Sequence, residues 1–476
     1  MSLATRSQIV DYAYIVAVIC FIYSLKWMNK PVTAQKGNRV GEIGMAIAIL
    51  ATLLNYSHGG VGHVPGTIAD YQWIVLGLVL GAVAGIPLAV LTPMKDVPQQ
   101  IAFMRACGGL AAALVGTAEF YLQESGLIHS HFNMAALCAE VILGYLTFTG
   151  SLVAAGKLQE ILPQKPILYK GHNVVKGIVL IAAVGVAVYL NFEPTHTGVF
   201  IALIAIPLLL GVLLIMAIGG ADMPTVIALL NAYGGLSSAM MGFVLANKLL
   251  IVAGALDGSS GLILSIIMCK AMNRSFTNVL FGGFGAVASK GTTEKRPYRS
   301  GTAEEAASIL EAASSVVIVP GYGMAVAQAQ HKVRELYDAL TKAGIDVKFA
   351  IHPVAGRMPG HMNVILADAN VPYDALVEMD DINPEFAQTD VVLIIGANDV
   401  TNPAAKTDKT SPIYGMPILD VDKARSVMVI KRSMSPGFAG IDNDLFYMDK
   451  TLMLFGDAKG FTGDIVKEFS AAMAGA

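Results

Sequence analysis

The stretch Val316–Ala329 has the residue types and spacing of a turn that binds a dinucleotide. It reads VVIVPGYGMAVAQA, with Gly321 and Gly323 placed between an apolar run and a helical stretch. In a GxGxxG turn the first glycine allows the tight bend, and the second lets the backbone approach a pyrophosphate at the helix N-terminus. Val326 replaces the third glycine, so the pattern is partial. A glycine-rich strand end that binds nothing is its simplest alternative.

The second strand of this pattern indicates the type of nucleotide. NAD sites place an acidic side chain about 20 residues past the glycines, where it binds the ribose 2′-hydroxyl. Here that strand ends in FAIHP, at residues 349–353, without a carboxylate. Lys431, Arg432 and Ser433 follow another apolar run and offer two cations and a hydroxyl to a 2′-phosphate. A solvated basic pair is the alternative, but with the missing acid these residues favour NADP(H) over NAD(H).

Three more glycine-rich turns follow apolar runs. They are HPVAGRMPGH at 352–361, GANDVTNPAA at 396–405 and GDAK at 456–459. Each is compatible with simple turn chemistry. Several such loops at one edge of a parallel sheet nevertheless favour a ligand-binding crevice.

These turns require a domain in which strands and helices alternate. We expect strands near 315–319, 346–351, 375–379, 391–395, 416–420, 426–431 and 452–455, and helices near 302–312, 323–343, 360–369 and 460–471. Thr302, with Glu305 three residues later, predicts a capped helix start. The alternation predicts an α/β Rossmann-like doubly wound parallel sheet over residues 301–476, after a linker at 276–300.

Residues 1–275 are predicted to form a multi-span α-helical membrane bundle. Hydrophobic residues make up 55% of the 476, charged residues 14%, and mean hydropathy is +0.61. About nine apolar windows are long enough to cross a bilayer, counting a shorter second one. They lie near 9–28, 42–56, 71–91, 101–121, 133–154, 175–191, 197–218, 224–246 and 248–268.

The distribution of basic residues predicts the orientation of the bundle. Lys and Arg follow the first, third, fifth and ninth windows, whereas the loops near 57–70, 122–132 and 192–196 contain neither. By the positive-inside rule this places the N-terminus outside and the C-terminal domain in the cytoplasm. The net charge of −3 suggests no nucleic-acid partner. The four cysteines form no CxxC or histidine-paired pattern, so we expect neither a metal site nor a disulfide framework.

Several polar residues lie at membrane depth, where a charge normally faces a partner or a wet cavity. Arg105 has two possible ion-pair partners, Glu140 and Asp257, and such a pair would have a structural role. Asp222 precedes a helix and is also a candidate N-cap. The full set of polar candidates is Arg105, Glu140, Asp222, Asn231, Asp257, Ser259 and Ser260.

Over nearly its whole length the chain resembles the beta subunit of the proton-translocating NAD(P) transhydrogenases. The runs that carry the resemblance are GGADMP, SSGLILSIIMCKAMNRS, PGYGMAVAQAQ, HPVAGRMPGHMNV, GANDVTNPAA, KRSMSPGFAG and LFGDAK. The family couples hydride transfer between NADH and NADP⁺ to proton movement, and proton influx drives NADPH formation. The resemblance therefore implies a multi-pass enzyme subunit of the bacterial inner membrane.

The resemblance also implies partners. Hydride transfer between two nicotinamides needs two nucleotide sites, and this chain has one fingerprint, which takes NADP(H). An alpha subunit must therefore supply the NAD(H) site and extra membrane helices, and two such assemblies are expected to form a dimer within the lipid bilayer. A transporter or channel whose cytoplasmic domain senses NADP(H) is the alternative, and it would need no such partner.

Residue roles follow from the matching motifs. The resemblance assigns coupling or proton translocation to Asp399, Asp222 and Asn231, with Arg105 at the position of a relay histidine. It assigns a lid over the cofactor to residues 433–440. The implied cofactor-binding set is Gly321, Tyr322, Gly323, Met324, Ala325, Val326, Arg357, Pro359, Gly396, Ala397, Asn398, Asp399, Lys431, Arg432, Ser433, Met434, Gly437, Phe438, Ala439, Gly440, Gly456, Asp457, Ala458 and Lys459.

The sequence departs from the family pattern at three positions. Arg105 stands where a titrating histidine is expected, and an arginine stays charged in proteins. The relay histidine therefore belongs to a partner chain, or the proton path differs. Phe438 replaces the lid tyrosine and removes a hydroxyl, and Asp257 stands where an apolar residue is expected.

Overall fold

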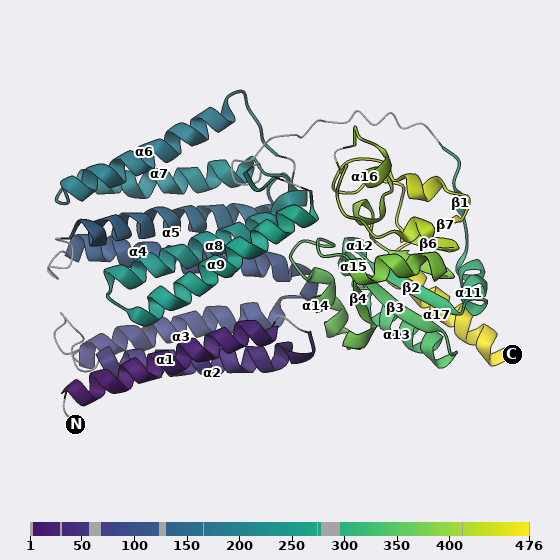
Figure 1. The fold of residues 1–476 in the computed structure, drawn as a ribbon, viewed down its shortest axis with the longest axis horizontal. Coiled ribbons are helices and arrows are strands. Elements are labelled where there is room, and N and C mark those ends of the chain that lie inside the picture. Colours follow the sequence, from purple (N-terminus) through teal and green to yellow (C-terminus); the bar gives the residue numbers. More distant parts are fainter. Residues whose placement is uncertain are drawn as a thin grey trace.

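A computed structural model of the chain shows a helical bundle with an α/β domain at one end (Figure 1). It describes residues 3–28, 31–56, 68–122, 130–164, 166–273, 275–277, 296–411 and 413–475.

Among the described residues, nine helices are long and apolar enough to cross a membrane, as predicted. The second helix is longer than its apolar window because it already begins at Pro31. The helices are α1 (Leu3–Met28), α2 (Pro31–Tyr56), α3 (Ile68–Leu91), α4 (Val97–Leu122), α5 (His131–Leu158), α6 (His172–Phe192), α7 (Thr197–Met216), α8 (Met223–Val244) and α9 (Lys248–Ala271).

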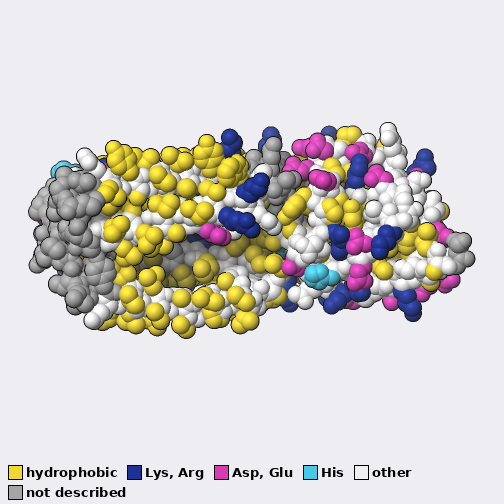
Figure 2. Space-filling model, turned by 90° about the horizontal axis from the view of Figure 1, so that it is seen from below, with side chains coloured by type: hydrophobic (Ala, Val, Ile, Leu, Met, Phe, Trp, Pro, Cys, Tyr) yellow, Lys and Arg dark blue, Asp and Glu magenta, His cyan; other side chains and the backbone are white. Residues whose placement is uncertain are grey.

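Helix α5 is the centre of the bundle. It packs against α4, α6, α7 and α8, whereas α1 and α2 form a pair that contacts α9. Small residues allow close approach: a Cβ on Gly254 of α9 would lie 2.7 Å from the carbonyl oxygen of Gly235 of α8. Apolar side chains cover the bundle surface seen in Figure 2, while charged side chains are concentrated over the α/β domain and the junction.

The α/β domain is built on an all-parallel sheet with the strand order β1-β7-β6-β5-β2-β3-β4. This arrangement confirms the predicted Rossmann-like class. The strands are β1 (Arg299–Ser300), β2 (Ser315–Pro320), β3 (Asp346–Ile351), β4 (Leu376–Glu378), β5 (Val391–Ile395), β6 (Ser426–Lys431) and β7 (Thr451–Phe455).

Helices cover both faces of the sheet and give the domain two apolar cores. One core packs the sheet against α11 (Ala303–Glu311), α13 (Gln330–Lys342), α14 (His361–Asp368) and α17 (Ala458–Gly475). The other includes α15 (Met379–Ile382) and the segments before β6 and β7. The Thr302 hydroxyl accepts a hydrogen bond from the Glu305 amide at 3.3 Å, as the predicted cap requires.

Three details of the domain differ from the prediction. Residues 416–420 are not a strand: Leu419 donates to the Val400 carbonyl at 2.9 Å, so this apolar segment pairs with a loop instead of the sheet. Strand β1 was not predicted, because two exposed residues carry no pattern. The expected helix 323–343 is two helices, α12 (Tyr322–Val326) and α13, separated at Gln328, which has a left-handed φ of 49°.

Candidate functional site

The candidate site lies at the carboxyl edge of the sheet, where β2 and β5 are neighbours. The chain continues from β2 to β3 on one side and from β5 to β6 on the other, so this is the switch point at which open α/β sheets bind ligands. The turn after β2 and the loop after β5 touch each other. The Gly323 amide donates to the Gly396 carbonyl at 2.9 Å.

The glycines of this edge have a structural task. A Cβ on Gly323 would lie 2.8 Å from the Cα of Gly396, and Gly396 has a φ of +70°, which favours glycine. In the structure the backbone of this turn closely approaches the neighbouring loop, and its approach to a pyrophosphate stays a prediction. The glycine pattern alone therefore does not identify a nucleotide.

Buried polar groups beneath residues 433–440, the predicted lid, are stronger evidence for a bound ligand than the glycines are. The Asn398 amide nitrogen and one Asp399 carboxylate oxygen are buried and have no hydrogen-bond partner within the described ranges. The other Asp399 oxygen accepts from the Ala439 amide at 2.9 Å. Burial raises the pKa of Asp399, which lies directly under Gly437 of the lid. Unpartnered buried groups of this kind normally find a partner in a ligand or water.

The basic residues meet the lid and the last predicted loop. The Lys431 ammonium donates to the Ser435 carbonyl, and burial lowers the pKa of this lysine. Arg432 pairs with Asp457 of the GDAK loop at 3.0 Å, and the Ser433 hydroxyl lies 2.8 Å from that of Ser435. The exposed Arg432 and Ser433 are accessible to a phosphate group.

An aromatic and cationic cluster joins three of the predicted loops. Tyr322 of the first turn lies 5.6 Å from Phe438 of the lid, between ring centroids. The guanidinium of Arg357 lies 4.4 Å from the Tyr322 ring and 6.0 Å from the Phe438 ring. Burial raises the pKa of Tyr322, while Arg357 opposes that shift. Residues from three separate turns therefore gather in one place.

The remaining predicted residues line the same edge at different depths. Met324, Ala325, Ala397 and Ala458 are buried, and Pro359, Met434 and Gly456 are half-buried. Val326, Gly440 and Lys459 are exposed, although the Lys459 amide donates to Asp457 at 3.2 Å.

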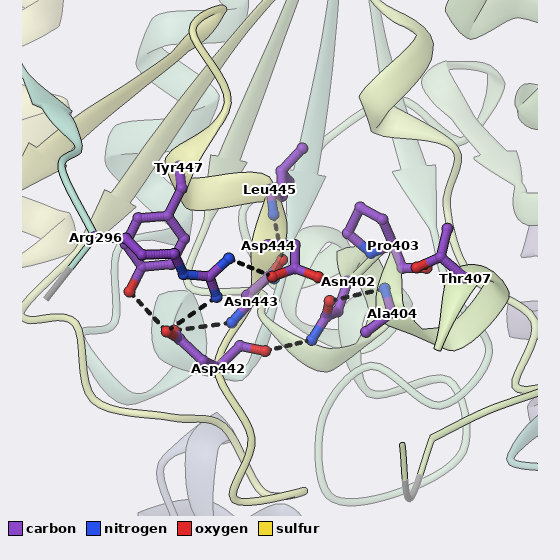
Figure 3. Close-up of polar contacts among 10 residues, drawn as sticks. All are labelled: Arg296, Asn402, Pro403, Ala404, Thr407, Asp442, Asn443, Asp444, Leu445 and Tyr447. Carbon is purple, nitrogen blue, oxygen red and sulfur yellow. Dashed lines mark hydrogen bonds and ion pairs between the residues drawn. The ribbon is translucent and has the colours of Figure 1, made fainter. Parts of the chain in front are cut away.

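A polar cluster that sequence reasoning missed holds the segment that follows residues 433–440 in place (Figure 3). Arg296 pairs with Asp444 at 2.9 Å and Asp442 at 3.6 Å, and its guanidinium lies 4.3 Å from the Tyr447 ring. The Asn402 amide donates to the Asp442 carbonyl at 2.9 Å. The segment before the sheet, the loop after β5 and the segment after the lid are thereby tied together. The only signal was the position of Asn402 in the GANDVTNPAA run.

The same sheet edge contacts the bundle. Arg357, with a side chain only 6% exposed, donates to the Leu158 carbonyl at the end of α5 and pairs with Glu160 at 2.9 Å. Asn273, just after α9, donates to the Tyr414 carbonyl at 2.7 Å. A loop assigned to nucleotide binding is therefore attached directly to a membrane-spanning helix.

The membrane candidates form a separate cluster within the bundle. Arg105 pairs with Asp257 at 2.9 Å, and Asn231 donates to the other oxygen of Asp257 at 3.1 Å. Of the two possible partners of Arg105, the structure selects Asp257. Ser259 and Ser260 donate to carbonyls of their own helix. Asp222 occupies the N-cap position of α8 without a side-chain capping bond.

Comparison with known proteins identifies the family. The family model described as NAD(P) transhydrogenase beta subunit matches residues 10–468. The chain belongs to this family. It is 50% identical over 465 residues to NAD(P) transhydrogenase subunit beta of Rhodospirillum rubrum, covering 96% of this chain and 98% of the relative. The same-named protein of a particular strain of that species matches equally well.

Membership of the transhydrogenase beta subunit family supports an oxidoreductase role for the chain. It implies that NADP(H) is the nucleotide of the α/β domain. A beta subunit also implies an alpha subunit as its partner.

Proposed function

We propose that the chain couples hydride transfer between NAD(H) and NADP(H) to proton movement across the bacterial inner membrane, forming NADPH from NADH as protons flow inward. Its α/β domain lies in the cytoplasm and works with the NAD(H) site of an alpha subunit, in a dimer of such assemblies. The contact between Arg357 and the end of α5 carries this proposal, because it joins a nucleotide loop to a membrane helix.

The orientation rests on the position of the domain. It lies at the end of the bundle where α5 and α9 end, which is the end that bears the basic loops. By the positive-inside rule that end faces the cytoplasm.

The residues of the sheet edge would hold NADP(H) without acid–base chemistry. Lys431, Arg432 and Ser433 would take the 2′-phosphate, because a phosphate attracts the two cations and a hydroxyl can hydrogen-bond to it. Asn398 and Asp399 supply unpartnered polar atoms beneath the lid. The bound nicotinamide supplies the hydride chemistry, while the chain orients the ring and excludes water.

We place the partner's membrane helices against the side of α4 that has a surface cavity. A cavity of about 460 Å³ is lined there by Gln100, Ile101, Met104, Arg105 and Gly108. Figure 2 shows a hollow in the apolar surface of the bundle. A partner helix in this region would bring its own titrating group close to Arg105, which cannot relay a proton itself.

Asp399→Asn in the complete assembly, reconstituted into vesicles with the alpha subunit, tests this coupling. Asp399 contacts the lid and is the buried acid of the nucleotide edge, so its charge should link lid position to proton state. We expect hydride transfer to continue while proton uptake per NADPH falls. An unchanged proton-linked rate would count against the assignment of Asp399. If the wild-type assembly shows no hydride transfer at all, the NADP(H)-sensing transporter becomes the better description.

A further inference from the structure

A second acidic residue of the bundle has no role in the site described above. Glu140 of α5 is fully buried, and neither of its carboxylate oxygens has a hydrogen-bond partner among the residues described. Nine residues separate it from His131 at the start of α5, which places it about 14 Å inside the helix at 1.5 Å per residue. An ionisable group at this depth normally serves a function, because burying its charge costs several kcal/mol.

The carboxyl group of Glu140 lies where Gly116 has no side chain and so leaves room for it. A Cβ on Gly116 of α4 would lie 3.0 Å from the Glu140 carboxyl carbon and 3.1 Å from an oxygen. From the other side, the Ser237 hydroxyl of α8 donates to the Glu140 backbone carbonyl at 2.9 Å, and the side chain does not share that bond. The carboxyl group is thus held between α4 and α5.

Two further unpartnered polar groups lie on the same face of α5. The hydroxyls of Thr147 and Ser151 are fully buried and have no hydrogen-bond partner in the described part of the chain. Their spacing from Glu140, seven and then four residues, keeps all three on one helix face. The polar line therefore extends about 16 Å along α5 toward Leu158, where Arg357 binds.

Few charges act on Glu140 from the helices around it. On α4 the nearest is the half-buried Glu119, whose carboxylate repels that of Glu140, and Arg105 lies farther along, held by Asp257. Helix α7 contains no titratable residue and α8 contains only Tyr233. The remaining titratable groups are Cys107 and Tyr121 of α4, His131, Cys138, Tyr145 and Lys157 of α5 itself, and His172, Lys176 and Tyr189 of α6. Among the described residues no cation forms an ion pair with Glu140, so no salt bridge opposes its protonation.

We infer that Glu140 is an intramembrane proton-binding site that takes up and releases the translocated proton, with Thr147 and Ser151 continuing its path toward the nucleotide domain. This inference rests on the proposed function. It names a residue that can bind and release a proton, which Arg105 cannot do. The step is a simple exchange: the carboxylate gains a proton from the outer side and later loses it toward the cytoplasmic side.

Glu140→Gln in the assembly with its alpha subunit tests the inference in two ways. Infrared spectra of reconstituted membranes, recorded while the pH is raised, should show a protonated carboxyl band that disappears in the wild type and is missing in the variant. Proton uptake per NADPH formed should fall at least tenfold. The amide has the shape of the protonated acid, so it fits beside Gly116. Glu193→Gln, at the exposed end of α6, is the matched control and should leave both readouts unchanged.

Wild-type proton uptake in Glu140→Gln would overturn the inference, as would an infrared band that the variant retains. If the wild type transfers hydride without proton uptake, the proposed function fails instead. The infrared titration then decides by itself whether Glu140 binds a proton.

Discussion

Removing the charge of Glu160 should increase the affinity of the full chain for NADP⁺. In the structure the Arg357 guanidinium is engaged by Glu160 and by the Leu158 carbonyl, both at the end of α5. Arg357 also belongs to a loop that we assign to NADP(H). We therefore expect a nucleotide phosphate and the bundle to compete for one guanidinium. Glu160→Gln should weaken the hold of the bundle on Arg357 while the Leu158 contact remains.

The expected size of the effect follows from exposure. The Arg357 side chain is 6% exposed but that of Glu160 is 66% exposed, so solvent screens the pair. Ion pairs of this kind contribute at most about 1 kcal/mol. Because each 1.4 kcal/mol is a factor of ten, NADP⁺ should bind more tightly to Glu160→Gln by a factor of up to about five.

Calorimetric titration of NADP⁺ into the detergent-solubilised full chain measures this change. Fragment 290–476 lacks the bundle, so it should already bind NADP⁺ more tightly than the full chain does. Glu193→Gln is a control with the same charge change at a distant position. Equal affinity of the wild type and Glu160→Gln, or weaker binding by the variant, would refute the competition for Arg357.

Three other predictions concern the α/β domain, studied as fragment 290–476. Arg432→Ala should weaken NADP⁺ binding at least tenfold and leave NAD⁺ binding unchanged, since a charged hydrogen bond contributes about 1.5–3 kcal/mol; calorimetry with both nucleotides checks this. Burial lowers the pKa of His352 and His361 from 6.5 to about 4. Their contribution to stability, up to about 3 kcal/mol each, is complete above pH 6.5 and is lost as the pH falls toward 4. Urea unfolding should show this loss, and His361→Gln should remove roughly half of it. Gly396→Ala, at a φ of +70°, should cost about 1–3 kcal/mol of unfolding free energy in the same assay.

The sequence predicts most of the fold because both parts follow simple patterns. Apolar windows of about 20 residues identify membrane helices, and continuous apolar runs such as VVLII identify buried parallel strands. The run at 416–420 has the same composition but lies against the loop containing Val400. An apolar composition indicates that a segment is buried, but it does not indicate which backbone the segment pairs with. A strand at 416–420 could therefore not be excluded from the sequence.

The sequence predicts which turns form the site, but it does not predict the long-range contacts within it. Motifs bring the turns after β2, β3 and β5 to one sheet edge, because parallel strands end there together. They do not show that Gly323 packs against Gly396, or that Arg357 reaches Leu158. Those contacts depend on how two elements far apart in sequence meet. A single sequence holds no local signal for such a meeting.

Two of the departures from the family pattern explain each other. An arginine at position 105 is always charged, and a charge within the bundle is costly unless it is paired. Asp257 supplies the opposite charge at 2.9 Å, and Asn231 hydrogen-bonds the remaining oxygen of that carboxylate. Arg105 without Asp257 would leave an unpaired cation, and Asp257 without Arg105 an unpaired anion, so the two residues act as one unit. This ion pair holds α4 against α9. Under the proposed function we therefore expect proton exchange at a group outside this cluster: at Glu140 of α5, whose carboxylate has no hydrogen-bond partner among the described residues, or at a residue of the partner subunit.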